Sequence, residues 1–142
     1  PQQLVRGYRQ LASGALSAGM VGMNVNIANA LAAIFTATGQ DIASVHESSI
    51  GQLFVELSDD DSIYASLVLP SLLIGTVGGG TGLPEQQECL KLMGCAGAGK
   101  SAAFAEVIAG FCLALELSTL SALAADEFAS AHERLGRNRP KP

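Results

Sequence analysis

The residues of this chain best suited to chemistry are a carboxylate near its start and a histidine near its end. Asp41 follows a helix-ending glycine in segment 39–41, and His132 lies in segment 131–134, ahead of a basic tail. A buried Asp can tune a neighbouring Lys or His, and an imidazole that titrates near neutrality can act as a general acid. The plain alternatives are that Asp41 caps the next helix and that His132 is an exposed side chain of a charged helix.

A glycine-rich loop, Gly75-Thr-Val-Gly-Gly-Gly-Thr-Gly82, lies between these two residues. Its consecutive glycines remove every Cβ, so backbone N–H groups can face a ligand; they are Gly78, Gly79 and Gly80. A helix predicted after the loop would add the positive end of its dipole, which suits a phosphate or a cofactor. The loop is neither GxGxxG nor a P-loop, and a bare flexible turn is the alternative interpretation.

The remaining candidates are interpreted as structural. His46 has no evident partner in the sequence. Glu106 and Glu116 lie in a mostly apolar helix, where a buried carboxylate needs a partner, so we expect them to be paired or interfacial rather than catalytic. The cysteines are odd in number and contain no CxxC pair, which indicates neither a disulfide framework nor a metal site; they are Cys89, Cys95 and Cys112. Reduced thiols in a cytoplasmic protein are the expectation.

Composition limits the class of protein. A chain of 142 residues fits one domain, and its hydrophobic fraction of 49% is high for a small soluble monomer. The net charge of −5 argues against general nucleic-acid binding. The basic tail is either a solvated end or a contact for an anion such as a phosphate. The most apolar run, Val107–Leu115, is too short for a membrane span of about 20 residues, so we expect a buried helix and no membrane segment in this chain.

Hydrophobic periodicity predicts the elements that must position these residues. Two apolar strands, 53–57 and 63–69, flank an acidic turn and predict a hairpin, and 72–77 is a candidate third strand. Asn24 or Asn26 is expected to cap the helix that follows. The predicted helices are 2–23 (loose, with glycine interruptions), 27–38, 41–47, 84–93, 101–125 and 126–134. The predicted class is α+β: a small antiparallel sheet with a long central helix and flanking helices.

Several of these segments, taken in order, resemble 3-hydroxy-3-methylglutaryl-coenzyme A (HMG-CoA) reductase. The run GTVGGGT followed by LPxQQxCL is highly specific to that family. The resemblance covers roughly residues 10 to 139, in the segments Asn29–Asp41, Leu69–Thr81, Leu83–Leu90, Glu116–Ser118, Ala122–Ala125 and His132. It implies that residues 1–142 are the carboxy-terminal portion of the large catalytic domain, a fragment of a longer protein, with 135–142 as a basic tail.

The resemblance also implies a reaction. The family is an oxidoreductase of the mevalonate pathway of isoprenoid biosynthesis, and it reduces HMG-CoA to mevalonate and coenzyme A with two NADPH. Its catalytic group is a Glu, a Lys, an Asp and a His, of which the Asp matches Asp41 and the His matches His132. In the family the Asp holds the Lys that polarises the thioester carbonyl, and the His protonates the departing thiolate.

The resemblance assigns binding residues as well. Asn29 and Ala131 are expected at the substrate, and the cofactor is expected at Gly78, Gly79, Gly80, Thr81, Arg137 and Arg139. The family assembles its sites at a subunit interface, so a homodimer or homotetramer is expected. The family's Glu and Lys are not in this chain, since Lys91 and Lys100 do not match, and the fragment alone should be inactive. Asn26 stands where many relatives have a His.

Two other functions are open from the sequence. One is a non-catalytic relative that keeps the fold as a dimerisation or scaffold module. The other is a nucleotide-binding module that uses only the glycine-rich loop.

Overall fold

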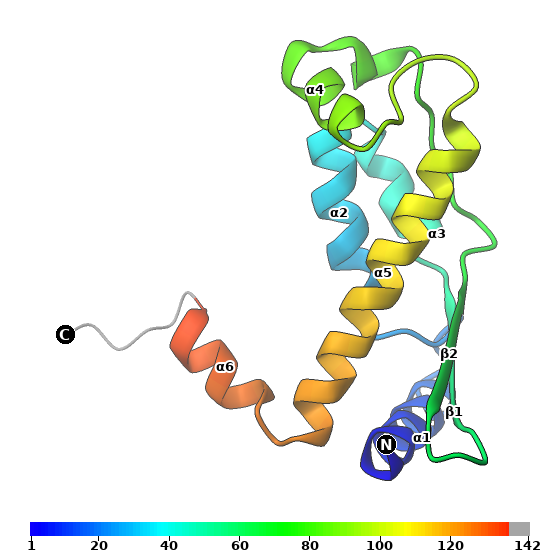
Figure 1. Cartoon of the computed structure of the whole chain (residues 1–142), viewed down its shortest axis with the longest axis vertical. Helices are drawn as coiled ribbons and strands as arrows, with labels where there is room; N and C mark the ends of the chain where they lie inside the picture. Colours follow the sequence, from blue (N-terminus) through cyan, green and yellow to red (C-terminus); the bar gives the residue numbers. More distant parts are fainter. Residues whose placement is uncertain (137–142) are drawn as a thin grey trace.

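Helix α5 (Ser101–Ala124) runs along most of the molecule, and the other elements are arranged around it (Figure 1). The computed structural model of the chain describes residues 1–136. The other elements are α1 (Gln2–Ser17), α2 (Ile27–Thr38), η1 (Ile42–Ser44), α3 (Val45–Ser48), β1 (Gln52–Leu57), β2 (Ile63–Val68), η2 (Gly79–Gly82), α4 (Pro84–Leu92) and α6 (Phe128–Leu135). The predicted α+β class, with a small antiparallel sheet and a long central helix, is confirmed.

The buried side chains of α5 recur every four residues; they are Phe104, Ile108, Cys112, Glu116 and Leu120. We call this set the buried stripe of α5. A helix has 3.6 residues per turn, so each step of four residues advances the stripe by about 40° around the axis. The facing direction therefore turns by roughly 160° between Phe104 and Leu120. One helix can thus serve two hydrophobic clusters that lie on different sides of it.

These two clusters form the core. The first joins α2, α4 and α5 through Ile27, Leu31, Phe35, Leu90, Phe104 and Ile108, among others. The second joins α1, β1 and α5 through Val5, Leu53, Val55 and Leu120. Glu116 lies on the stripe between Cys112 of the first cluster and Leu120 of the second.

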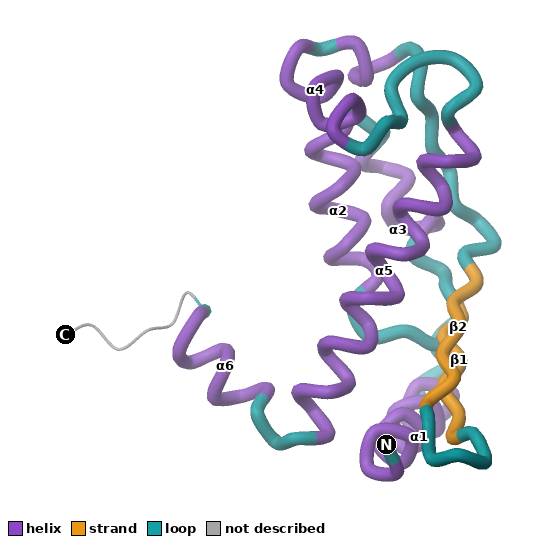
Figure 2. The backbone as a smooth tube through the Cα atoms, in the orientation of Figure 1, coloured by secondary structure: helices purple, strands orange, loops and turns teal. Residues whose placement is uncertain are grey.

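Strands β1 and β2 form the predicted antiparallel hairpin, drawn in orange in Figure 2. The register runs from Gln52 opposite Val68 to Leu57 opposite Ile63. Side chains alternate along β1, with Leu53 and Val55 buried and Phe54 and Glu56 exposed, as expected of a strand with one covered face.

The third strand expected over 72–77 is wrong. The backbone of this segment bonds to neighbouring loops and side chains instead of to a strand: Leu73 N–H donates to Ser48 Oγ (3.1 Å) and Gly75 N–H donates to Gln40 Oε1 (2.8 Å). The apolar residues pack on the first cluster through Leu72 and Ile74. The hydrophobic pattern was that of a buried extended segment, and only its neighbours decide whether such a segment joins a sheet.

The helices differ from prediction mainly at their ends. Helix α1 is regular up to Ser17, with Gly14 inside it, whereas a loose helix to residue 23 was expected. Gly39 ends α2 in the left-handed conformation (φ 71°), as predicted. Neither Asn24 nor Asn26 caps α2 with its side chain: Asn24 donates to Ser49 and Gly51, and Asn26 makes no capping bond.

Helix α5 is also long and apolar enough to cross a membrane, judged by length and composition alone. Core helices of water-soluble domains share these properties, and the packing of α5 on α1 and α2 favours that interpretation. The sequence-based expectation of no membrane segment stays a prediction. Only 22% of the most apolar window is buried within the described residues, so much of its apolar surface is uncovered.

Candidate functional site

The glycine-rich loop has an open backbone. Gly78 (φ 82°) and Gly79 (φ 53°) lie in the left-handed region, which disfavours residues with a Cβ. A Cβ added at either position would meet no atom within 4 Å, so the space over both residues is open to a ligand. Thr81 is buried and its hydroxyl donates to the Gly78 carbonyl oxygen (2.6 Å), which holds the turn closed.

The loop is docked on the end of α2 by two glycines. A Cβ on Gly39 would lie 2.4 Å from the backbone of Gly80, and a Cβ on Gly80 would lie 2.8 Å from the Gly39 carbonyl oxygen. No side chain fits between them. The side-chain oxygen of Gln40 also accepts a hydrogen bond from the Gly75 N–H of the loop. The glycine-rich loop is therefore in direct contact with Gly39 and Gln40, and Asp41 is the next residue along the chain.

A small pocket opens at this loop. Its volume is about 180 Å³, below the roughly 300 Å³ of small-molecule sites, so it can receive only part of a dinucleotide. The lining residues are Thr76, Val77, Gly78, Thr81, Gly82, Gln87, Leu90, Ala96 and Gly97. Helix α4 starts directly after the loop, but Glu85 in its first turn already places a negative charge near the positive end of the helix dipole. The open backbone, rather than this helix end, is the feature that fits a cofactor.

Asp41 is exposed and caps the 3₁₀ turn η1. Its Oδ1 accepts a hydrogen bond from Ala43 N–H at 3.0 Å. Asp41 therefore has the capping role that was the alternative to a catalytic one in the sequence analysis. The carboxylate remains accessible, and within the described residues no Lys or His is hydrogen-bonded or ion-paired to it.

His132 is exposed on α6 with one ring nitrogen engaged. Nδ1 lies 3.0 Å from the Phe128 carbonyl oxygen, and the two rings are tilted against each other with centroids 4.3 Å apart. A carbonyl oxygen only accepts, so Nδ1 carries the hydrogen and Nε2 is left to bind or release a proton. This tautomer is the one that a general acid–base acting through Nε2 requires.

Asn29 is exposed on the first turn of α2. Its Nδ2 donates to Asn26 Oδ1 at 2.6 Å, and the Asn26 amide in turn donates to Thr119 of α5 (3.4 Å). Ala131 is half-buried on α6, next to His132. The two cofactor candidates Arg137 and Arg139 lie outside the described residues.

Within one chain these candidates lie in three places. Asp41 and the glycine-rich loop are at the carboxyl end of α2, whereas Asn29 is near its start, and a helix of 12 residues is about 18 Å long. His132 is on α6, which turns back from the end of α5 that lies away from α4 (Figure 1), and α5 itself is roughly 36 Å long. The structure brings the segment that precedes Asp41 to the loop but does not bring His132 to either within one chain.

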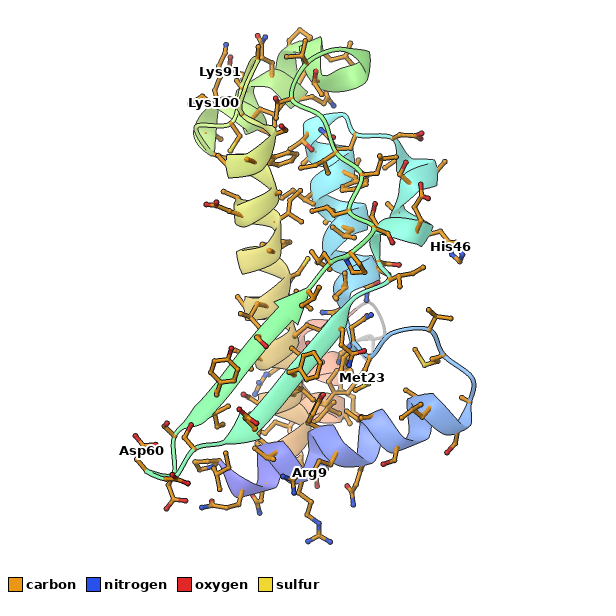
Figure 3. The ribbon with its side chains drawn as sticks, turned by 90° about the vertical axis from the view of Figure 1, so that its right-hand side faces the viewer. Arg9, Met23, His46, Asp60, Lys91 and Lys100 are labelled. Atoms are coloured by element: carbon orange, nitrogen blue, oxygen red, sulfur yellow. The ribbon has the colours of Figure 1, made fainter. Side chains whose placement is uncertain are left out.

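The other charged candidates face solvent. Figure 3 shows Lys91 and Lys100 at the end of the molecule that α4 forms, and Lys91 is ion-paired with Glu88 (2.7 Å). His46 points outward from α3 (Figure 3).

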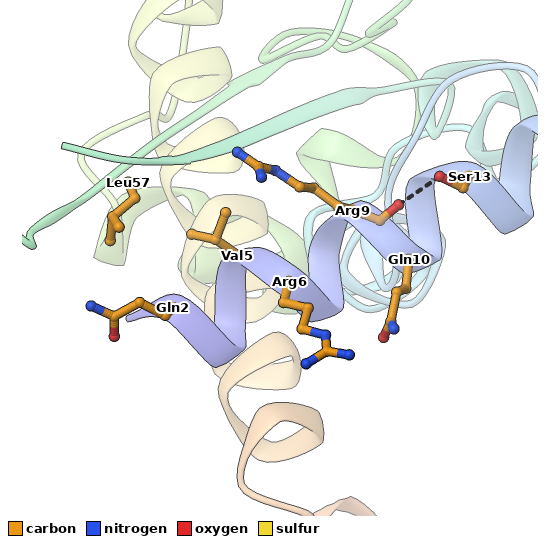
Figure 4. A pocket seen from close by; sticks show the side chains of 7 residues that line it. All are labelled: Gln2, Val5, Arg6, Arg9, Gln10, Ser13 and Leu57. Carbon is orange, nitrogen blue, oxygen red and sulfur yellow. Dashed lines mark hydrogen bonds between the residues drawn. The ribbon is translucent and has the colours of Figure 1, made fainter.

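A pocket of about 700 Å³ lies along α1 with Leu57 at its edge. Figure 4 shows Arg6 and Arg9 pointing apart there, and the pocket lies away from the glycine-rich loop.

Glu116 is the residue whose role the sequence did not identify. It was expected to be paired or interfacial, and its carboxylate is fully buried and accepts hydrogen bonds from the backbone at the start of α2. A signal was present: Glu116 falls at four-residue spacing from Cys112 and Leu120, on the buried stripe. Glu106, by contrast, is exposed.

Comparison with known proteins agrees with these features. The sequence profile of the hydroxymethylglutaryl-coenzyme A reductase family matches residues 1–137. The chain is 48% identical to the 3-hydroxy-3-methylglutaryl-coenzyme A reductase of Pyrococcus horikoshii over 129 residues, 87% of this chain and 31% of that protein. It is 51% identical to that of Aeropyrum pernix (87% and 30%) and 46% identical to that of Schistosoma mansoni (84% and 13%).

The chain therefore belongs to the hydroxymethylglutaryl-coenzyme A reductase family, a family of enzymes. It spans about a third or less of the length of these curated relatives.

Proposed function

We propose that this chain is the carboxy-terminal part of an enzyme that reduces HMG-CoA to mevalonate and coenzyme A with NADPH, for isoprenoid precursor synthesis. The observation that supports this best is the contact between Gly39 and Gly80, which joins the chain just before Asp41 to an open glycine backbone. Family membership supports the class of reaction. The free cysteines fit a cytoplasmic location, which we propose as well.

Reducing a thioester to an alcohol takes two hydrides, which bound NADPH supplies. The exposed backbone of Gly78 and Gly79 would meet the cofactor, and Arg137 and Arg139 are proposed to meet its phosphate. In this proposal Asp41 accepts a hydrogen bond from a Lys that lies outside these 142 residues and so fixes the ammonium at the thioester oxygen, where negative charge develops.

His132 is proposed to act when the carbon–sulfur bond breaks. The electron pair of that bond goes to sulfur, and His132 Nε2 gives a proton to the thiolate, which yields coenzyme A as the free thiol. The bond from Nδ1 to Phe128 keeps the ring in the required tautomer. Because His132 and Asp41 are far apart in one chain, we propose that one site takes them from two subunits of a homodimer or homotetramer.

Replacing His132 tests this assignment. In the complete reductase, His132→Gln should lower kcat for HMG-CoA by about 10²- to 10⁴-fold, the usual contribution of a general acid. Reduction of the free aldehyde, mevaldehyde, should stay close to wild type because no thiolate departs in that step. Both rates are followed by NADPH absorbance, and His46→Gln is the matched control on an exposed helix.

Two results would contradict the assignment. The first is an equal loss of both reductions in His132→Gln, which would mean general damage to the site. The second is clear turnover by residues 1–142 alone, since the Glu and the Lys would then not come from elsewhere.

The scaffold alternative is favoured by one observation, the uncovered apolar surface of α5. It predicts a complete protein that folds and associates but does not oxidise NADPH in the presence of HMG-CoA.

A further inference from the structure

We infer that Glu116 is a positioning residue of the substrate site: it holds the start of α2 and thereby fixes the Asn26–Asn29 pair. The inference rests on the proposed function, in which Asn29 contacts the HMG portion of the substrate. Glu116 itself is fully buried and touches no ligand in this scheme.

The contacts of Glu116 span 90 residues of sequence. Its Oε2 accepts from Val25 N–H at 2.7 Å, and its Oε1 accepts from Asn26 N–H. Both oxygens are therefore committed to the backbone that leads into α2, where the N–H groups lack partners within the helix. The negative charge also lies at the positive end of the α2 dipole. The Glu116 carboxylate on α5 therefore caps the start of α2, where the Asn26 side chain makes no capping bond.

Releasing the Asn26 side chain from capping leaves it available for another task. The Asn26 Oδ1 accepts a hydrogen bond from Asn29 Nδ2 (2.6 Å), and the Asn26 Nδ2 donates to Thr119 Oγ1 (3.4 Å). Thr119 lies on α5, one turn from Glu116. Helix α5 therefore holds Asn26 at two points, by its backbone and by its side chain, and Asn26 orients Asn29.

The orientation of Asn29 matters because its amide is only partly used. An Asn amide offers two donor hydrogens and one acceptor oxygen. The bond to Asn26 uses one hydrogen, and the exposed remainder, one N–H and the carbonyl oxygen, can face the carboxylate and hydroxyl of an HMG group. If Asn26 moves, this donor and acceptor move with it.

The test is Glu116→Gln in the complete reductase. A Gln keeps one acceptor oxygen and brings an NH₂ group against a backbone N–H, so one bond is lost and two donors meet. We expect KM for HMG-CoA to rise on the order of tenfold, below the roughly 10²-fold that a misplacement of about 1 Å can cause. KM for NADPH should stay within about twofold, because the glycine-rich loop is at the other end of α2.

Two variants of α5 separate positioning from loss of stability. Leu120→Ala removes a buried side chain of the same stripe without touching Asn26, so it should lower the melting temperature and leave KM for HMG-CoA unchanged. Glu106→Gln removes an exposed charge from the same helix and should change neither. Glu116→Ala should raise KM for HMG-CoA further than Glu116→Gln does.

The possible failures are distinguishable. If the wild-type protein turns over HMG-CoA but Glu116→Gln alters KM no more than Leu120→Ala does, or alters both KM values alike, the positioning role is wrong and the proposed function stands. If the wild-type protein neither binds nor reduces HMG-CoA, the proposed function is wrong and the inference fails with it.

Discussion

Cys112 and Glu116 lie on consecutive turns of the buried stripe of α5, and each changes the environment of the other. Burial, and second the neighbouring Glu116 carboxylate, raise the pKa of the Cys112 thiol to about 11. Burial also raises the pKa of the Glu116 carboxyl, against the backbone N–H groups of Asn26, Val25 and Ile27, which lower it. The thiolate form of Cys112 is therefore suppressed, and we expect this cysteine to be unreactive in the folded protein.

The suppressed thiolate can be measured by alkylation of the native protein. At about pH 8, a rise in pKa from 9.0 to about 11 cuts the thiolate fraction of Cys112 about 100-fold, and burial also shields it from the reagent, so Cys112 should react much more slowly than half-buried Cys89. Mass spectrometry of the labelled peptides reads out each position, and labelling in denaturant is the control in which all three cysteines react. Equal native rates for Cys89 and Cys112 would show that α5 is not packed as described.

At the scale of elements, the contact between the end of α2 and the glycine-rich loop decides where Asp41 lies. Gly39 satisfies two requirements at once: a left-handed conformation that stops α2 and a surface without a Cβ against Gly80. Gly80 likewise has no Cβ that would separate the two backbones. The helix end and the loop can therefore approach to backbone contact, which neither element achieves alone.

Substituting Gly39 should therefore cost stability and disturb the site. Gly39→Ala places a Cβ 2.4 Å from the Gly80 backbone and forces an L residue to φ +71°. We expect the free energy of unfolding to fall by at least about 1–2 kcal/mol, the cost of the left-handed conformation alone. Urea denaturation measures it. Gly82→Ala is the matched control in the same loop, with nothing within 4 Å of its Cβ, and should change stability by less than about 0.5 kcal/mol. Equal effects of the two substitutions would argue against the docked loop.

At the scale of the whole molecule, the chain carries an uncovered apolar surface. Side chains of α2, α5 and the end of α4 line an apolar depression; they are Ala33, Ile34, Ala37, Met93, Val107 and Phe111. Helix α5 is apolar on nearly all sides, and such helices are normally enclosed in a larger core. The chain spans about a third of the length of its Pyrococcus and Aeropyrum relatives, and we propose that the rest of a reductase or a second subunit covers this surface.

Mixing two inactive variants tests whether a site takes Asp41 and His132 from different subunits. Asp41→Asn and His132→Gln subunits of the complete reductase, mixed at random in a dimer, give heterodimers as half of the population. If the two residues of one site come from different subunits, each heterodimer has one intact site, and the mixture should recover about a quarter of wild-type activity. Recovery is measured by NADPH oxidation after co-refolding, with each variant alone as the control. If both residues of a site came from the same subunit, no mixture would recover activity.

The sequence by itself determined the local elements, because their signals are local. Gly39 predicts the end of α2, Pro84 predicts the start of α4, and the alternation around Leu53 and Val55 predicts a strand. The motif GTVGGGT with LPxQQxCL indicated the family, which the comparison confirmed. From spacing alone Asp41 and His132 were as consistent with a cap and an exposed side chain; the family resemblance assigned them catalytic roles, which stay predictions.

The tertiary structure alone decided how these elements meet. Gly39 against Gly80, and Glu116 against Asn26, join positions about 40 and 90 residues apart, where no short pattern records the pairing. The segment 72–77 had the composition of a strand, but its neighbours offered side-chain partners instead of a sheet edge. The separation of His132 from Asp41 follows from the length of α5, a rigid rod whose direction is set by packing against α1 and α2. Residue spacing along the chain predicts the helices and the strands, whereas the distances between them depend on contacts that form only when the chain is folded.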